Sequence, residues 1–173
     1  MKIIIIREET PLDVEGIREI NEAAFNQPNE GRIADRIRES CSESLSLVAV
    51  LDGKIVGHIF FSPVEIETKS GIIKGMGLAP MAVKPNCQNQ GIGSELVNEG
   101  LKIMREGKHP FVIVLGHPEY YPRFGFKKAS VYGLTCQWEG VPDEVFMAII
   151  LDEEKMSGVS GEVRYRDEFN YAM

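Results

Sequence analysis

An amide-rich segment with two glycines, Gln88 to Ser94, contains the residues in this sequence whose types and spacing best suit ligand binding. Gly91 and Gly93 stand where a strand-like apolar run gives way to a helical repeat. Glycines at such a junction let backbone N–H groups approach a ligand, and the first N–H groups of a helix lack partners within the helix. The helix dipole adds partial positive charge there. The segment therefore predicts a site for a phosphate or pyrophosphate group.

Two elements must position this segment. Residues 78–83 form an apolar run that is typical of a strand and that ends at the turn sequence of residues 84–86. After the segment, apolar residues recur at helical spacing and predict one buried helix face, made of Ile92, Leu96, Val97, Leu101 and Met104. The sequence thus predicts a strand, a loop and a helix, with the glycines at the helix start.

Two common phosphate-binding motifs are excluded by specific residues. A P-loop needs Gly-Lys-Ser or Gly-Lys-Thr after its glycines, whereas Gly93 is followed by Ser94 and Glu95. A dinucleotide-binding fingerprint needs a third Gly or Ala and an acidic residue at the end of the next strand. Leu96 occupies the third position, and residues 111–115 contain no acid.

The hexapeptide Gln88-x-x-Gly91-x-Gly93 resembles the pyrophosphate loop of the GNAT superfamily of acetyl-CoA-dependent N-acetyltransferases. A second motif, Tyr121-x-x-x-Gly125-Phe126, resembles the Tyr-x-x-x-Gly-Phe sequence of the same family and follows the loop at the expected distance. The string LGHPEYYPRFGF around it resembles a subgroup of predicted acetyltransferases. A glycine-rich strand-to-helix turn that binds nothing is the alternative interpretation of the loop alone.

The order of the predicted elements extends this resemblance along most of the chain. The resemblance implies an α/β (α+β) GNAT fold, in which about four helices flank a mixed, mostly antiparallel central sheet of about seven strands. Its fourth and fifth strands, residues 72–83 and 111–115, are expected to separate, and Pro80 predicts a bulge or an unpaired edge because proline cannot donate to a ladder. The other predicted strands are residues 3–7, 45–51, 54–67 and 145–151 and a strand after Gly125. The predicted helices are residues 11–25, a short helix after residue 29, the helix after Gly91 and one or two turns before Gly125.

Length and composition indicate a single globular domain over residues 1–173. The apolar fraction of 43% and charged fraction of 26% are typical of soluble proteins, and no apolar run approaches the ~20 residues of a membrane span. Cys41, Cys87 and Cys136 are widely spaced, without metal-binding spacing, and predict reduced thiols in a cytoplasmic protein.

The distribution of charge favours an anionic cofactor. The net charge of -7 argues against nucleic acid as a partner. Residues 71–128 nevertheless contain 8 basic and 4 acidic side chains, whereas the segments on either side are net acidic. The predicted phosphate loop therefore lies in the only net basic part of the chain, as an anionic ligand requires.

The resemblance implies a function and assigns residues to it. Acetyl-CoA would be the co-substrate, without a metal, and its acetyl group would pass to a primary amine by direct attack in a ternary complex. Tyr121 would protonate the leaving thiolate, and Tyr120 is the next candidate. The residues expected to bind the cofactor are Met81, Ala82 and Val83 for the pantetheine and Gln88, Asn89, Gln90, Gly91, Ile92, Gly93 and Ser94 for the pyrophosphate.

The base, the acceptor and the oligomeric state each have more than one candidate in the sequence. Residues 78–83 lack the Glu that this family often uses as a base, which leaves Glu30, His58, His117 or a water molecule. The acceptor is a small-molecule amine or a protein amino group, and the oligomeric state, a homodimer included, stays open. A non-catalytic acyl-CoA-binding or sensing module is the main alternative, and a binding protein for another nucleotide is a weaker one. Candidates for the ribose phosphate of CoA are Arg123, Lys127 and Lys128.

Overall fold

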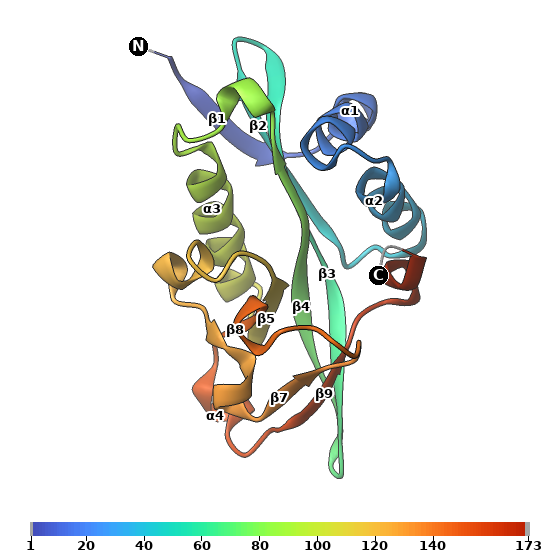
Figure 1. The fold of residues 1–173 in the computed structure, drawn as a ribbon, viewed down its shortest axis with the longest axis vertical. Helices are drawn as coiled ribbons and strands as arrows, with labels where there is room; N and C mark the ends of the chain where they lie inside the picture. Colours follow the sequence, from blue (N-terminus) through green and yellow to red (C-terminus); the bar gives the residue numbers. More distant parts are fainter. Residues whose placement is uncertain (1, 172–173) are drawn as a thin grey trace.

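A computed structural model describes residues 2–171 (Figure 1). Residue 1 and residues 172 and 173, which the predicted domain includes, lie outside the described range. The described residues form one nine-stranded sheet in the order β1-β2-β3-β4-β5-β8-β6, to which β9 adds by pairing with β3 and with β7. The strands are β1 (Ile4–Glu8), β2 (Leu45–Leu51), β3 (Lys54–Thr68), β4 (Gly71–Val83), β5 (Phe111–Leu115), β6 (Lys127–Lys128), β7 (Leu134–Cys136), β8 (Phe146–Ile150) and β9 (Gly161–Arg164).

Helices cover both faces of the sheet, with α3 on one face and α1 and α2 on the other (Figure 1). The predicted apolar face of α3 is confirmed, because all five of its residues are buried in one core cluster with β2, β3, β4 and β5. Ile33 and Ile37 of α2 belong to a second cluster on the opposite face. The helices are α1 (Val14–Phe25), α2 (Asn29–Ser40), α3 (Ile92–Glu106) and the short α4 (Glu153–Met156).

The N-terminal helix begins one turn later than the sequence predicts. Residues 11–13 form a 3-10 turn, and α1 starts at Val14. The Asp13 carboxylate accepts hydrogen bonds from the Thr10 N–H at 2.7 Å and from the Arg7 guanidinium at 2.7 Å. These contacts, the guanidinium first, lower the pKa of Asp13 to about 2. Thr10 and Asp13 therefore form a capping box on the 3-10 turn that leads into α1.

The predicted irregularity at Pro80 is present, and it lies where β4 and β5 separate. The register between β3 and β4 shifts so that Ile59 opposes Met81 while Phe61 opposes Leu78. Two residues of β4 therefore lie opposite one residue of β3, which is a bulge. On its other edge, β4 pairs with β5 in parallel only over Met76–Leu78. Beyond Leu78 no strand formed by residues 2–171 pairs with this edge of β4, and the sheet opens between β4 and β5.

The C-terminal part differs from the prediction in its detail. The sheet has nine strands where about seven were expected, because residues 131–141 contain β7, which pairs in parallel with β9. The turns expected before Gly125 form only a 3-10 helix, Tyr121–Phe124, which ends at Gly125 in the left-handed conformation. β7 and β9, with three and four residues, show too little alternation of apolar and polar residues for sequence to reveal them.

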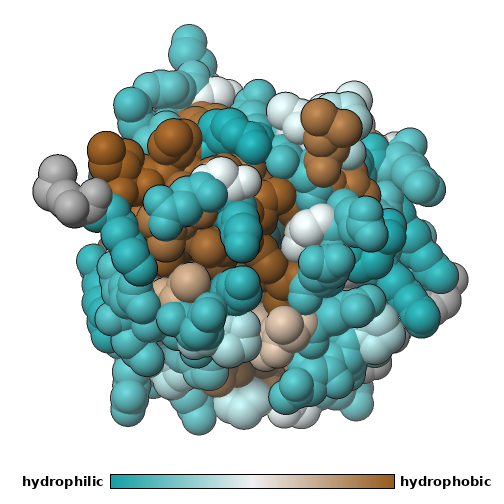
Figure 2. All heavy atoms as spheres, turned by 90° about the horizontal axis from the view of Figure 1, so that it is seen from above, coloured by the Kyte–Doolittle hydropathy of each residue, from teal (hydrophilic) through white to brown (hydrophobic). Residues whose placement is uncertain are grey.

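The end of the molecule seen in Figure 2 exposes apolar side chains, which gather in the upper left of the view and extend towards its middle. Large exposed apolar residues in the N-terminal part of the chain include Ile3, Ile5 and Leu12. None of these three lines the cavity described below. None of the helices formed by residues 2–171 has the length and apolar character that crossing a membrane requires.

Candidate active site

A cavity of about 850 Å³ occupies the opening between β4 and β5. Its wall includes Leu78 to Val83 of β4 and Leu115 at the end of β5. On one side it is lined by residues that pack with α3, and on the other by residues that pack with α2. The cavity therefore crosses the sheet where the two strands separate. We call the part lined by Ile92, Met81 and Tyr121 the α3 side. We call the part lined by Ile33, Tyr165 and Phe169 the α2 side.

Hydrogen bonds between side chains and backbone shape the loop before α3. The Gln88 side-chain amide donates to the Val83 carbonyl at 3.1 Å, and the Gln90 side-chain amide donates to the Asn86 carbonyl at 3.4 Å. Gly91 has a φ of 86°, in the left-handed region that glycine adopts without strain. The loop is thereby folded back on the end of β4, and α3 begins immediately after it.

The start of α3 presents unpaired amides to the cavity. The Glu95 N–H donates to the Gly91 carbonyl at 3.0 Å, so the amides of residues 92–94 precede the first helical hydrogen bond. A Cβ on Gly93 would lie 2.9 Å from the Tyr120 hydroxyl, so a side chain there would crowd the space in front of these amides. Free N–H groups, a helix dipole and a cradle that a Cβ would fill together suit a phosphate group.

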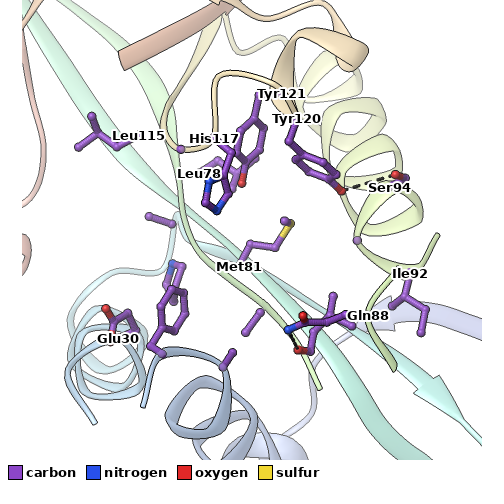
Figure 3. A pocket seen from close by; sticks show the side chains of 18 of the residues that line it. Glu30, Leu78, Met81, Gln88, Ile92, Ser94, Leu115, His117, Tyr120 and Tyr121 are labelled. Atoms are coloured by element: carbon purple, nitrogen blue, oxygen red, sulfur yellow. Dashed lines mark hydrogen bonds between the residues drawn. The ribbon is translucent and has the colours of Figure 1, made fainter. Parts of the chain in front are cut away.

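Two adjacent tyrosines face the cavity from the segment after β5 (Figure 3). Tyr121 is only 6% exposed, and its ring lies against Gly116, where an added Cβ would come within 2.3 Å of a ring carbon. Burial raises the pKa of Tyr121 above its ordinary value, which keeps the phenol protonated at neutral pH. The Tyr120 hydroxyl lies 3.5 Å from the Ser94 Oγ, so this tyrosine spans the gap to α3.

The three candidates for a base occupy different environments. Glu30 and His117 line the cavity, whereas His58 does not. His58 is fully buried, with its Nδ1 at 3.2 Å from the Asn21 Nδ2 and its Nε2 at 2.9 Å from the Ser46 Oγ. Burial, with a smaller effect of the Arg38 charge, lowers the pKa of His58 to about 3. His58 is thus a neutral, hydrogen-bonded part of the core.

The structure brings most of the predicted site residues together. Gln90 is the one predicted cofactor-binding residue that does not line the cavity. Arg123 lines it and lies over the Tyr120 ring at 5.2 Å, whereas Lys127 and Lys128 do not reach it. No group of three or more potential metal ligands occurs among residues 2–171. The predicted residues that line the cavity are Met81, Ala82, Val83, Gln88, Asn89, Gly91, Ile92, Gly93, Ser94 and Tyr121.

The sequence did not reveal the residues on the α2 side of the cavity. These residues are mostly aromatic, and they come from segments far apart in the chain. The only hints in the sequence were the aromatic tail and a single tryptophan in a long connection. The residues are Phe25, Ile33, Trp138, Tyr165 and Phe169.

Known proteins with the same features are acetyltransferases. A family model described as an acetyltransferase (GNAT) domain matches residues 5–129. The Escherichia coli protein YhbS, described as an uncharacterized N-acetyltransferase, is 34% identical over 168 residues, which cover 96% of this chain and 99% of YhbS. YjhQ of E. coli, with the same description, is 37% identical over 120 residues, 68% of this chain and 66% of YjhQ.

Two solved structures share both the fold and a substantial part of the sequence. E. coli YhbS in complex with CoA has a TM-score of 0.91 at 34% identity, covering 98% of this chain and 93% of that chain. A GNAT family acetyltransferase from Brucella melitensis in complex with acetyl-CoA has a TM-score of 0.80 at 34% identity. This match covers 96% of this chain and 98% of that chain. The motifs, the separated strands and these similarities agree, and the chain belongs to the GNAT family of acetyltransferases.

Proposed function

We propose that this chain transfers an acetyl group from acetyl-CoA to a primary amine by direct attack within a ternary complex, and that residues 1–173 act as one acyltransferase domain. The observation that carries the proposal is the continuous cavity that joins the amides at the start of α3 to Tyr121 and then crosses the sheet. It provides room for both substrates at once. The CoA and acetyl-CoA complexes of the two relatives support the choice of co-substrate.

Backbone groups of this chain suit the two polar parts of CoA. In our proposal the N–H groups of residues 88–94 hold the pyrophosphate at the start of α3. None of the described strands pairs with the edge of β4 beyond Leu78, so Met81, Ala82 and Val83 can pair with the pantetheine amides as a sheet pairs with an added strand. Both interactions use main-chain atoms, which explains why the loop needs glycine more than particular side chains.

Tyr121 is the proposed acid for the departing CoA sulfur. When the amine nitrogen bonds to the acetyl carbon and the carbon–sulfur bond breaks, the sulfur leaves with the electron pair and needs a proton or a hydrogen bond. Because the pKa of buried Tyr121 lies above that of a thiol, about 8.5, complete proton transfer from the phenol is uphill. We therefore expect a contribution at the low end of the ~10²–10⁴-fold range for general acids.

The amine must lose a proton to become a product amide. An ammonium ion has no free electron pair, so a proton acceptor is needed on or near the α2 side. Glu30 and His117 line the cavity and are the side chains placed for this step, either directly or through water. His58, buried and paired in the core, is withdrawn as a candidate.

A non-catalytic acyl-CoA-binding or sensing module is the second candidate function. The observation that favours it is the lack of any carboxylate in Leu78–Val83, where members of this family often have a catalytic Glu. Such a module would bind acetyl-CoA with the same loop but release no thiol. The two functions therefore differ in turnover and agree in binding.

A turnover assay that detects free CoA thiol tests the proposal. The panel contains small amines, polyamines, aminoglycosides and peptides with free amino termini, and binding of acetyl-CoA is followed separately by thermal shift. Release of thiol with formation of an N-acetyl product supports the enzyme. A thermal shift without turnover for any amine favours the binding module. A shift with NADH or ATP but none with millimolar acetyl-CoA would contradict both.

A further inference from the structure

The α2 side of the cavity is built as a site of its own, distinct from the part proposed for CoA. Its walls come from the end of α1, the start of α2 and the segments around β7 and β9. Tyr165 packs between two other aromatic rings, with centroids 5.0 Å from Trp138 and 5.2 Å from Phe169. Phe25 and Ile33 complete an apolar enclosure. Such walls favour an aromatic or branched apolar ligand.

Two residues that line this enclosure each have a buried oxygen without a hydrogen-bond partner among the described residues. Among residues 2–171, four buried side-chain atoms lack a hydrogen-bond partner, and two of them belong to residues that line the cavity: the Glu30 Oε2 and the Tyr165 hydroxyl. The other Glu30 oxygen is held by the Gln27 side-chain amide at 2.9 Å. Leaving a buried polar atom unpaired costs free energy, so a ligand that supplies the missing partners is expected to gain affinity.

The charges around the enclosure select the kind of ligand. Among the lining residues that the structure describes, Glu30 is the only carboxylate and Arg123 is the only Lys or Arg. Arg123 lies over Tyr120, whose hydroxyl contacts α3, so its charge belongs to the α3 side. Figure 3 shows Glu30 across the cavity from Tyr120 and Ser94. A ligand carboxylate would meet Glu30 without a compensating cation, whereas an ammonium would pair with it.

We propose that the α2 side takes a small cationic amine with an aromatic or branched apolar body and no acidic group. The Glu30 carboxylate pairs with the positive charge, the Tyr165 hydroxyl supplies a second polar contact, and the aromatic walls enclose the body. This inference rests on the proposed acetyl transfer and names the acceptor class for it. Glu30 and Tyr165 are specificity-determining residues in this account.

A series of related amines tests the acceptor class with the wild-type protein. The probes are phenethylamine, phenylalanine, which adds a carboxylate to the same body, and ethylamine, which lacks the ring. We expect kcat/KM for phenethylamine to exceed that for each of the other two by about tenfold or more. Equal or higher kcat/KM with phenylalanine would overturn the inference.

Two variants with matched controls test the residues. Glu30→Gln should raise KM for phenethylamine by about tenfold or more, because a charge-assisted hydrogen bond becomes a neutral one, while the thermal shift with acetyl-CoA is retained. Tyr165→Phe should raise KM less, by roughly threefold. The controls are Glu39→Gln, exposed on the same helix, and Tyr132→Phe, away from the cavity. Wild-type kinetics in Glu30→Gln would overturn the inference.

Direct binding separates failure of this inference from failure of the proposed function. If no amine is turned over although acetyl-CoA binds, phenethylamine binding is measured by calorimetry with wild type and with Glu30→Gln. Binding that weakens about tenfold in the variant would support the amine site and contradict catalysis. No detectable binding of phenethylamine to the wild type would overturn the amine site.

Discussion

On the α3 side of the cavity, the groups that we propose for the pyrophosphate lie in one continuous segment, Gln88–Ser94, and are mainly backbone N–H groups. On the α2 side, the groups that we propose for the amine are the side chains of Glu30 and Tyr165 and the rings around them, which come from segments more than a hundred residues apart. The first site depends on backbone conformation, and the second on side-chain identity.

This difference bears on how the two sites can change. A site of backbone amides tolerates substitutions wherever the conformation is kept, so the glycines are its sensitive positions. A site of side chains changes its ligand when one residue changes. We therefore expect substitutions on the α3 side to affect binding of any acyl-CoA, and substitutions on the α2 side to alter acceptor choice.

The largest effect is expected from Gly91→Val. Gly91 has a φ of 86°, so a β-branched residue would push the backbone out of this region and turn the amides before α3 away from the ligand. Acetyl-CoA at 100 times its dissociation constant should stabilise the wild type by roughly 2.7 kcal/mol, and the variant should lose this shift. Gly93→Val should do the same, through its contact with the Tyr120 hydroxyl.

Gly53→Val is the matched control for Gly91→Val. Gly53 lies in the hairpin between β2 and β3 with a φ of 75°, and, as at Gly91, an added Cβ meets nothing within 4 Å. It should suffer similar strain yet keep the shift with acetyl-CoA. A full shift in Gly91→Val and Gly93→Val would remove the loop from the binding site.

The next largest effect is expected from Tyr121→Phe, which should lower kcat about 10²-fold and change KM for acetyl-CoA little. The ring still packs on Gly116, so the fold and ground-state binding should persist. Tyr120→Phe should cost less in kcat, since its hydroxyl faces Ser94 on α3. If steady-state kinetics show both variants at the wild-type rate, the tyrosine pair is structural and the non-catalytic module is favoured.

Arg123→Gln should have a smaller effect, confined to CoA. Of the three basic candidates for the ribose phosphate, only Arg123 lines the cavity, and a partly exposed ion pair contributes roughly 1 kcal/mol or less. CoA should therefore bind up to about fivefold more weakly, while dephospho-CoA binds as before. Lys127→Gln should leave both affinities unchanged. Equal calorimetric affinities for CoA and dephospho-CoA at low and high salt would exclude this role for Arg123.

Acidification should lower stability through His58, which lies outside the cavity lining. The pKa of His58 is lowered from 6.5 to about 3, so below pH 6.5 the unfolded chain binds a proton that the folded chain does not. The free energy of unfolding should therefore fall as the pH drops from 6.5 towards about 4.5, before Asp13 begins to titrate. Urea unfolding at several pH values measures this fall, which should be smaller in His58→Gln. An equal fall in the free energy of unfolding of both proteins would contradict this role of His58.

Particular residues show how far the sequence could be interpreted. The effects of Gly91, Gly93 and Pro80 depend on backbone conformation and on a missing donor, which each residue has wherever it lies. The loop and the irregularity at Pro80 could therefore be predicted, whereas the strand separation was implied by the family resemblance. The apolar repeat of α3 could be predicted for a similar reason, because helical spacing alone places its residues on one face. By contrast, His58 and Glu30 could not be told apart as candidates, although one lies in the core and the other in the cavity.

The sequence by itself determined the family resemblance, the glycine loop at the start of α3 that we propose for phosphate, the irregular fourth strand and the tyrosine after the fifth. All of these depend on neighbours within a few residues. Only the tertiary structure decided that β7 and β9 pair, that His58 is withdrawn into the core, and that Glu30, Trp138 and Tyr165 line one enclosure. Such contacts join residues widely separated in the chain, and chain folding rather than local conformational preference brings them together.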